Sequence, residues 1–197
     1  EEVFPAAKVF EKGGVKIAVI GQAMPRTAVA NPNWMFPDWE FGLREDDMQK
    51  QVDKARADGA AIVVLLSHNG VDNDKKMVSR VKGIDVCLTA HTHDAMPGVL
   101  QVGNTLVIAS GSHGKFVSRL DIEVKDRKLA GFRFKLMPVF SDAIAPDKDM
   151  AALIDKWRKP FEAELGRVVG HTDSLLYRRG NFNGTFDDLI CEAMLSE

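Results

Sequence analysis

The hydrophobic and polar positions of the N-terminal half alternate between strand-like runs and helix-like spacing. Residues 60–66 and 84–88 are almost continuously apolar, which indicates strands that are buried on both faces. Residues 43–58 and 73–81 carry apolar side chains at helical spacing, and a glycine follows each segment. Buried strands that alternate with helices predict an α/β sheet.

The segments before these elements predict a hairpin and a long loop. Residues 7–11 and 15–21 flank Lys12-Gly13-Gly14, a pattern typical of a β-hairpin. Residues 22–41 are rich in Pro, Asn and Trp and have no helical period, so we expect an ordered irregular loop. Its aromatic residues either wall a cleft or pack as part of the loop itself; they are Trp34, Phe36 and Trp39.

After residue 93 the pattern changes to short strands separated by polar or glycine-containing turns. These strands cover residues 99–102, 105–109, 116–124 and 129–137, and their spacing predicts an antiparallel meander. An α/β part followed by a β part suits two sheets packed face to face, with helices outside.

The C-terminal residues predict two helices and a strand. Residues 147–165 form the first helix, which Asp147 caps and Pro160 kinks or breaks. Residues 168–176 are interpreted as a strand that opens a new unit, and residues 185–196 as a helix.

Charge and cysteine content exclude several classes of protein. The chain has 197 residues, a formal net charge of −2 and two cysteines, Cys87 and Cys191, without the spacing of a metal-cysteine site or a disulfide framework. A near-neutral chain lacks the field that gathers nucleic acid or an anionic membrane. No apolar run approaches the roughly 20 residues of a membrane span. We therefore expect neither nucleic acid nor a membrane as a partner.

Three of the five histidines stand directly after the two buried strands. Residues 60–66 lead into Ser67-His68-Asn69-Gly70, and residues 84–88 lead into Thr89-Ala90-His91-Thr92-His93-Asp94. The carboxyl ends of strands in an α/β sheet form the crevice where ligands bind. If the two strands are neighbours, roughly 5 Å apart, the three imidazoles converge.

A metal site is the chemistry that this cluster favours. Residues two apart in extended backbone point to the same side, so His91 and His93 either share one ion or hold one ion each of a close pair. Imidazole suits Mn, Zn, Fe or Ni. Asn69 and Asp94 are placed to orient the ring nitrogens. The alternative is that each histidine is a hydrogen-bonded residue of the core or surface.

The other two histidines are less informative. His113 lies in a glycine-rich loop, where it either lines the same crevice or is an ordinary loop residue. We interpret His171 as structural.

The ends of the chain and a missing motif predict a fragment of a longer protein. The first residue is Glu1, no signal peptide is visible, and the terminal helix stops without a tail. A two-metal site usually has a bridging carboxylate, and no Asp-x-His segment precedes His68. We therefore expect the remaining ligands upstream of this chain.

The histidine motifs carry a family resemblance. Ser67-His68-Asn69-Gly70 followed by Ala90-His91-Thr92-His93 resembles the last two metal motifs of the calcineurin-like metallophosphoesterases, in their 5'-nucleotidase branch, with Ala90 where Gly is usual. Within that branch the chain is similar to the sulfate thiol esterases (thiosulfohydrolases) of bacterial thiosulfate oxidation. Five stretches carry this similarity, and the last is the most discriminating: 37–42, 65–70, 83–86, 91–95 and 176–186.

This resemblance, with the pattern above, implies the fold class. We expect an α/β chain that comprises the C-terminal half of a four-layer αββα metallophosphoesterase domain over 1–140. A linker helix over 141–166 and the truncated start of a second α+β domain over 167–197 follow.

The resemblance also implies the activity. It implies a periplasmic enzyme with two Mn(II) ions that releases sulfate from a cysteine-S-sulfonate on a sulfur-carrier protein. His68 and His91 would bind one ion and His93 the other. The acid/base histidine of the family lies in an Asn-His motif that is absent here, so no catalytic residue is assigned and this chain alone is expected to be inactive.

A basic loop supplies the predicted substrate-binding residues. Arginine presents forked donors that match the oxygens of a sulfonate, and the resemblance places such a loop beside the crevice. The alternative is a solvated basic turn. The residues concerned are Tyr177, Arg178, Arg179 and Asn181.

Two rival functions stay open. The first is a periplasmic 5'-nucleotidase or related phosphoesterase, which would need an aromatic pair for base stacking in its second domain. The second is a non-catalytic α/β binding module that uses its histidines structurally.

Overall fold

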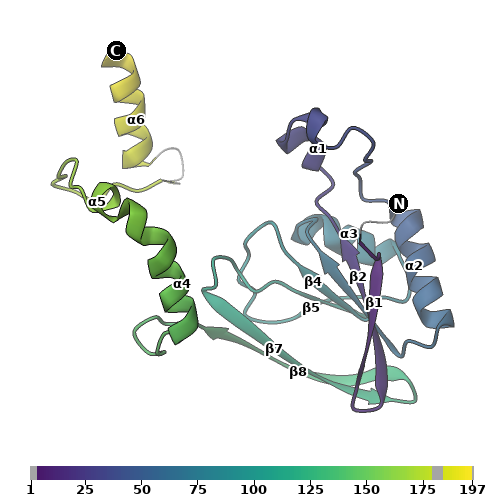
Figure 1. Cartoon of the computed structure of the whole chain (residues 1–197). Helices are drawn as coiled ribbons and strands as arrows, with labels where there is room; N and C mark the ends of the chain where they lie inside the picture. Colours follow the sequence, from purple (N-terminus) through teal and green to yellow (C-terminus); the bar gives the residue numbers. More distant parts are fainter. Residues whose placement is uncertain (1–3, 179–183, 197) are drawn as a thin grey trace. The chain divides into compact units, whose positions relative to one another are not determined.

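The larger sheet of the structure has six strands (Figure 1). The computed structural model describes residues 4–178 and 184–196, and the order of the strands is β1-β2-β3-β4-β6-β5. Strands β2 to β4 and β6 run parallel, and β1 and β5 add antiparallel edges. Their bounds are β1 Ala7–Lys12, β2 Val15–Gln22, β3 Ile62–Ser67, β4 Val86–Thr89, β5 Leu100–Val102 and β6 Thr105–Ile108.

The predicted N-terminal hairpin is confirmed. β1 and β2 pair antiparallel from Ala7↔Ile20 to Lys12↔Val15. The turn between them holds Gly13 and Gly14 at φ 57° and 74°. Two consecutive positive φ angles are the requirement of the tight turn that matches the twist of a hairpin, and glycine meets it without strain.

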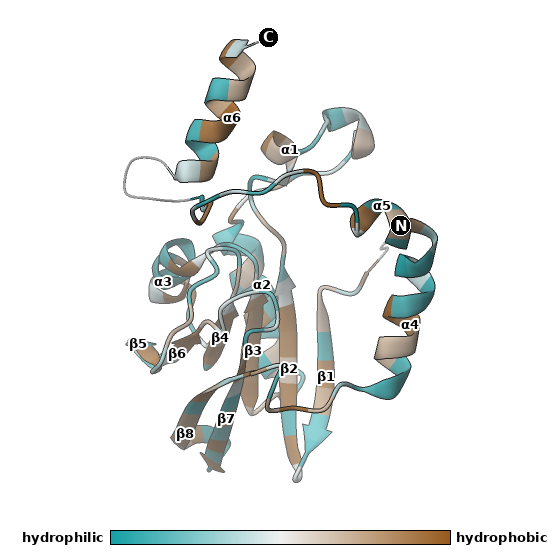
Figure 2. Ribbon diagram, turned by 90° about the vertical axis from the view of Figure 1, so that its left-hand side faces the viewer, coloured by the Kyte–Doolittle hydropathy of each residue, from teal (hydrophilic) through white to brown (hydrophobic). Residues whose placement is uncertain are grey.

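Two helices cover one face of the sheet, as the hydrophobic spacing predicts. α2 (Glu45–Ala57) buries Met48, Val52 and Ala55, and α3 (Val71–Arg80) buries Met77 and Val78. These side chains form the main core with buried residues of the central strands. Figure 2 shows the central strands as largely hydrophobic. The burial of this apolar area is the main force that holds the helices to the sheet.

A separate two-stranded sheet covers part of the opposite face. β7 (Phe116–Lys125) and β8 (Lys128–Pro138) form a long hairpin. Leu120 of β7 and Phe134 of β8 pack against the smaller core cluster, which contains Leu106 and Ile108. The same face leaves Leu66 54% exposed and Leu88 37% exposed, so the hairpin covers only part of it.

The predicted single meander is wrong in one respect. Four strands occur close to the expected positions, but β6 lies parallel to β4 inside the main sheet, and β5 pairs with β6 at its edge. All four residues of β6 are buried. A strand that is buried along its whole length suits a position inside a sheet covered on both faces, whereas a meander strand usually has one polar face.

The long loop after β2 contains short helices that the sequence did not predict. These are α1 (Thr27–Ala30) and the 3₁₀ turn η1 (Asn33–Met35). Beyond them Phe36 stacks edge-on against Phe41 with ring centroids 5.2 Å apart, and Trp39 lies beside both rings. Phe36, Trp39 and Phe41 therefore pack on one another and order this part of the loop from within, whereas Trp34 is 78% exposed.

The chain divides into two units, residues 1–144 and 145–197. In the second unit, α4 (Lys148–Arg158) is capped by Asp147, whose Oδ1 accepts a hydrogen bond of 2.8 Å from the Met150 amide. The expected break at Pro160 is confirmed, because a 3₁₀ turn, η2 (Lys159–Phe161), separates α4 from α5 (Glu162–Leu165).

The rest of this unit contains one of the two predicted elements, the terminal helix. α6 (Thr185–Ser196) forms as expected. The strand expected over 168–176 does not form. An extended segment needs a neighbouring strand for its backbone hydrogen bonds, and the described residues of this unit contain none. Within the described ranges, no helix has the length and apolar character to cross a membrane.

Candidate metal centre

His68 and His91 come together because their strands are neighbours. β3 and β4 pair in parallel with Ser67 opposite Thr89, and the Ala90 amide donates a hydrogen bond of 3.0 Å to the Ser67 carbonyl. Each histidine follows its strand by one or two residues, so both side chains leave the same edge of the sheet. Their ring centroids lie 5.2 Å apart. The structure thus places these two residues as the spacing predicts.

His93 forms a second pair, with His113. Their ring centroids are 5.5 Å apart in an edge-to-face arrangement. A short β-bridge between Ala95 and Ser110 and a hydrogen bond of 2.7 Å from the Gly111 amide to the Asp94 carbonyl tie the two loops together. His113, for which the sequence left two interpretations open, therefore lies beside a predicted metal ligand.

The backbone at these histidines is left-handed. The φ angles are 81° at His91, 61° at His93 and 58° at His113. His91 and His93 are therefore not in the extended conformation that was expected to point both side chains to the same side. Non-glycine residues with positive φ are uncommon, histidine is among the more tolerant types, and such conformations cluster at functional sites. Three of the six described non-glycine residues with positive φ are these histidines.

Asn69 and Asp94 take positions that the sequence did not predict in detail. The Asn69 side chain is buried, and its Nδ2 donates a hydrogen bond of 2.9 Å to Asp74 Oδ1. Asp94 is exposed, and its carbonyl binds the His113 loop. In the described structure both residues fix the backbone of the histidine-bearing loops.

The interior at this edge also contains Asp74, a buried residue that the sequence did not predict for the site. The described side-chain atoms that are buried without a hydrogen-bond partner are Asn69 Oδ1, Asp74 Oδ2 and Thr89 Oγ1. A signal for Asp74 was present, because it precedes Met77, Val78 and Val81 at the spacing of one helical face. An acidic residue on an apolar helical face marks a buried polar interaction.

Gly70 shows how tightly the two histidine turns pack. Its φ is 92°, and a Cβ atom there would lie 2.9 Å from Thr92 Cγ2. Only glycine combines this backbone angle with such a close approach.

The histidine pairs fit one side of a metal centre. Nitrogen ligands lie about 2.0–2.1 Å from a zinc ion, and other first-row metals bind imidazole similarly, so two rings that share an ion lie a few ångströms apart. The centroid distances of 5.2 Å and 5.5 Å agree with this requirement. Over residues 4–178 and 184–196, no group of three or more His, Cys, Asp or Glu side chains is gathered closely enough for one ion.

A small hollow adjoins His91. It has a volume of about 250 Å³, and Arg26 and Asp72 place opposite charges on its wall. Its lining residues are Met24, Pro25, Arg26, Asn69, Gly70, Asp72, Asn73, His91 and Thr92.

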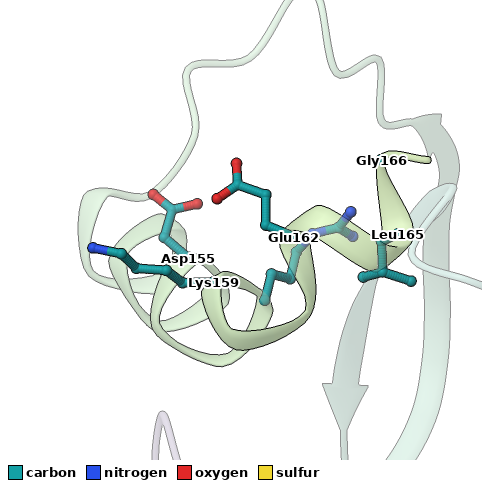
Figure 3. Close-up of a pocket in the computed structure, with 6 residues that line it drawn as sticks. Asp155, Lys159, Glu162, Leu165 and Gly166 are labelled. Carbon is teal, nitrogen blue, oxygen red and sulfur yellow. The ribbon is translucent and has the colours of Figure 1, made fainter.

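A larger hollow, of about 500 Å³, lies on the helices of the second unit (Figure 3). Asp155, Lys159 and Glu162 line it, and it contains no histidine. Of these two hollows, the one beside His91 adjoins a predicted metal ligand.

The predicted basic loop is described only in part. Arg179 and Asn181 lie outside the described residues. Arg178 is exposed, and its Nε donates a hydrogen bond of 2.9 Å to Asp187 Oδ1. The Tyr177 amide donates to Thr185 Oγ1 at 3.1 Å, which joins this loop to the start of α6. His171 is exposed and lies between α5 and α6.

Comparison with known proteins gives the family of this fold. No family model matches the chain. SoxB from Thermus thermophilus, a sulfate thiohydrolase solved in complex with glycerol, is 34% identical over 98% of this chain, with a TM-score of 0.92. A 5'-nucleotidase precursor, also from Thermus thermophilus, is 23% identical over 96% of the chain, with a TM-score of 0.82. Mouse 5'-nucleotidase is 23% identical over 98% of the chain.

These relatives are much longer than this chain. The chain spans 36% of SoxB, 41% of the bacterial 5'-nucleotidase and 37% of the mouse enzyme. The match to SoxB and the nucleotidases runs through both units and through both histidine motifs, and the sheet is that of part of a calcineurin-like phosphoesterase domain. The chain belongs to the 5'-nucleotidase branch of the calcineurin-like metallophosphoesterases.

Proposed function

We propose that the protein that carries this chain is a dinuclear metal hydrolase that releases sulfate from a cysteine-S-sulfonate on a sulfur-carrier protein. The observation that supports this most is the difference in identity among its relatives. SoxB shares 34% of the aligned residues, whereas the mouse and Naja atra 5'-nucleotidases share 23% and 22%. We place the reaction in the periplasm as part of the same proposal.

In this proposal the chain holds and orients the metal ions. His68 and His91 hold one ion and His93 the other, and two Mn(II) ions are the proposed cofactors. Such ions act as Lewis acids on the oxygens of the substrate and make water nucleophilic at neutral pH. The bridge between Ala95 and Ser110 fixes the loops of His93 and His113 relative to each other. This supports the proposal that His113 contacts the substrate or the His93 ion.

Recognition of the sulfonate is assigned to the basic loop. Arg178 and Arg179 supply charged donors for the anion, and Tyr177 and Asn181 supply further polar contacts. Asp187 already binds Arg178. The aspartate therefore holds the Nε edge of the Arg178 guanidinium in place. In this proposal the remaining N–H groups of the guanidinium bind the substrate.

Sulfate release is the test of this proposal. The full natural protein, loaded with Mn(II), is incubated with a carrier protein bearing a cysteine-S-sulfonate, and sulfate is measured by ion chromatography. We expect turnover that His68→Ala abolishes. The same protein is assayed with a nucleoside monophosphate, for which we expect far slower release of phosphate.

The 5'-nucleotidase alternative has its own support. The curated relatives that cover 95–98% of the chain include 5'-nucleotidases from mammals and snake venoms. Hydrolysis of a nucleoside monophosphate as fast as that of the sulfonated carrier would favour this alternative and reject ours.

Metal binding separates both hydrolases from a binding module with structural histidines. We expect the metal-free protein to take up two Mn(II) ions, measured by titration calorimetry. His68→Ala should weaken this uptake by more than the roughly 10–100-fold that loss of an outer hydrogen-bond partner costs. A protein that takes up no metal, with or without this substitution, would be a binding module.

A further inference from the structure

A buried carboxylate lies behind the turn that carries His68. Asp74, in the first turn of α3, has an exposed fraction of 0%. We infer that Asp74 is a positioning residue, which holds the 67–70 turn so that the His68 ring faces His91. The inference rests on the proposed metal centre and adds to it a residue that contacts neither metal nor substrate.

One carboxylate oxygen holds the turn on both sides of His68. Asp74 Oδ1 accepts a hydrogen bond of 2.7 Å from Ser67 Oγ and one of 2.9 Å from Asn69 Nδ2. Ser67 Oγ in turn accepts a hydrogen bond of 3.1 Å from the Asn69 amide. The residues before and after His68 are therefore fixed to the same atom, and the His68 backbone cannot rotate without breaking a buried hydrogen bond.

The far side of the turn is fixed to α3 as well. The Asp74 amide donates to the Gly70 carbonyl at 3.0 Å, and Asn73 Nδ2 donates to the Asn69 carbonyl at 2.9 Å. The His68 amide donates to the Gln22 carbonyl at 3.0 Å. The turn is thus bound to β2 and to α3, and only the His68 side chain is left exposed.

Asp74 also lies close to the strand that leads to His91. Burial raises the pKa of the Cys87 thiol on β4, and the Asp74 carboxylate raises it further. Cys87 therefore stays a neutral thiol beside the carboxylate. The same carboxylate contacts the His68 turn and lies next to the strand of His91, so its place in the fold suits control of the distance between the two rings.

The carboxylate acts on the turn through the donors that it satisfies. Met77 and Val78 on the same face of α3 are apolar and buried, whereas Asp74 accepts hydrogen bonds from Ser67 and Asn69. An apolar side chain at position 74 would leave these two buried donors without their acceptor. Both donors keep their places only while the carboxylate accepts from them, so Asp74 fixes the geometry of the turn.

Three variants of the full natural protein separate positioning from stability. Asp74→Leu removes the acceptor but keeps the site filled. Asp74→Asn keeps an oxygen that accepts from Ser67 and Asn69. Val78→Ala is the matched control, because Val78 is 4% exposed on the same helical face and its apolar side chain makes no hydrogen bond to the turn. Circular dichroism first identifies a temperature at which all three are folded.

The first measurement is Mn(II) affinity by titration calorimetry at that temperature. We expect Asp74→Leu to weaken binding by roughly 10–100-fold, as the loss of other outer partners of metal ligands does. Asp74→Asn should keep most of the affinity, and Val78→Ala should match the unsubstituted protein. A folded Asp74→Leu protein with unchanged affinity would reject the inference.

The second measurement needs no metal. In the metal-free protein, NMR relaxation of the His68 ring should show greater mobility in Asp74→Leu than in Val78→Ala. If the unsubstituted protein binds no Mn(II), the proposed function fails, and this second measurement still decides the inference: equal mobility in the two variants would reject it.

Discussion

Cys87 and Cys191 show how differently two residues of one type behave in this chain. Cys87 is fully buried in β4 and its thiol has a raised pKa, first because of burial and then because of Asp74. Cys191 lies on α6 and is exposed. Only a thiolate reacts rapidly with thiol reagents, so the two cysteines should differ strongly in reactivity.

We expect the folded chain at pH 8 to react with an aromatic disulfide reagent at one thiol, and the urea-unfolded chain to react at both. The reagent's absorbance measures the number of thiols. Cys191→Ser is the control and should abolish the fast reaction. Fast modification of two thiols in the folded chain would contradict the burial of Cys87.

The positions of the candidate histidines were predictable from sequence, but their backbone was not. The ends of two apolar runs placed His68 and His91 at the edge of the sheet. The sign of φ at His91 and His93 leaves no trace in a hydrophobic pattern. The sequence could not predict that His93 and His113 pair. Their pairing depends on the Ala95–Ser110 bridge, a contact between segments that are distant in sequence.

Strand β3 places consecutive leucines in opposite environments. Leu65 faces the helices and is 0% exposed, whereas Leu66 faces the partly open side and is 54% exposed. Successive side chains of a strand point to opposite faces. The same substitution at neighbouring positions should therefore have unequal costs.

We expect Leu65→Ala to lower the free energy of unfolding of this chain by about 2–5 kcal/mol, because it leaves a cavity in the core. Leu66→Ala should cost about 1 kcal/mol or less, because the side chain is already half exposed. Urea unfolding followed by circular dichroism measures both. Equal losses would mean that Leu66 is covered in solution.

Strand pairing explains where the prediction of elements failed. Helical spacing of apolar residues specifies α2 and α3, and the glycine pair specifies the β1–β2 turn. These signals are local, and the elements that they predict are confirmed. β6 and residues 168–176 depend instead on which neighbour is present. β6 pairs with β4. Residues 168–176 have no partner strand among the described residues of the second unit.

The two units of the chain differ in their cores. All buried hydrophobic residues that the structure describes belong to residues 1–144. In the second unit, α4 has 11 residues, α6 has 12, and α5 has 4. Isolated helices shorter than about 12–15 residues are marginal in water.

We therefore expect residues 1–144, expressed alone, to show a cooperative unfolding transition in urea. Residues 145–197 should show low helicity and no cooperative transition, as monitored by circular dichroism. A sigmoidal transition in the 145–197 peptide would contradict this difference and would indicate a core that the described residues lack.

The left-handed backbone of His91 and His93 has a consequence for engineering. Glycine adopts φ angles of 81° and 61° with less strain than any residue that carries a Cβ atom. A screen for heat resistance would therefore reward glycine at both positions. The selected protein would keep its scaffold and resist unfolding better, yet it would have lost two of the imidazoles proposed to hold the ions.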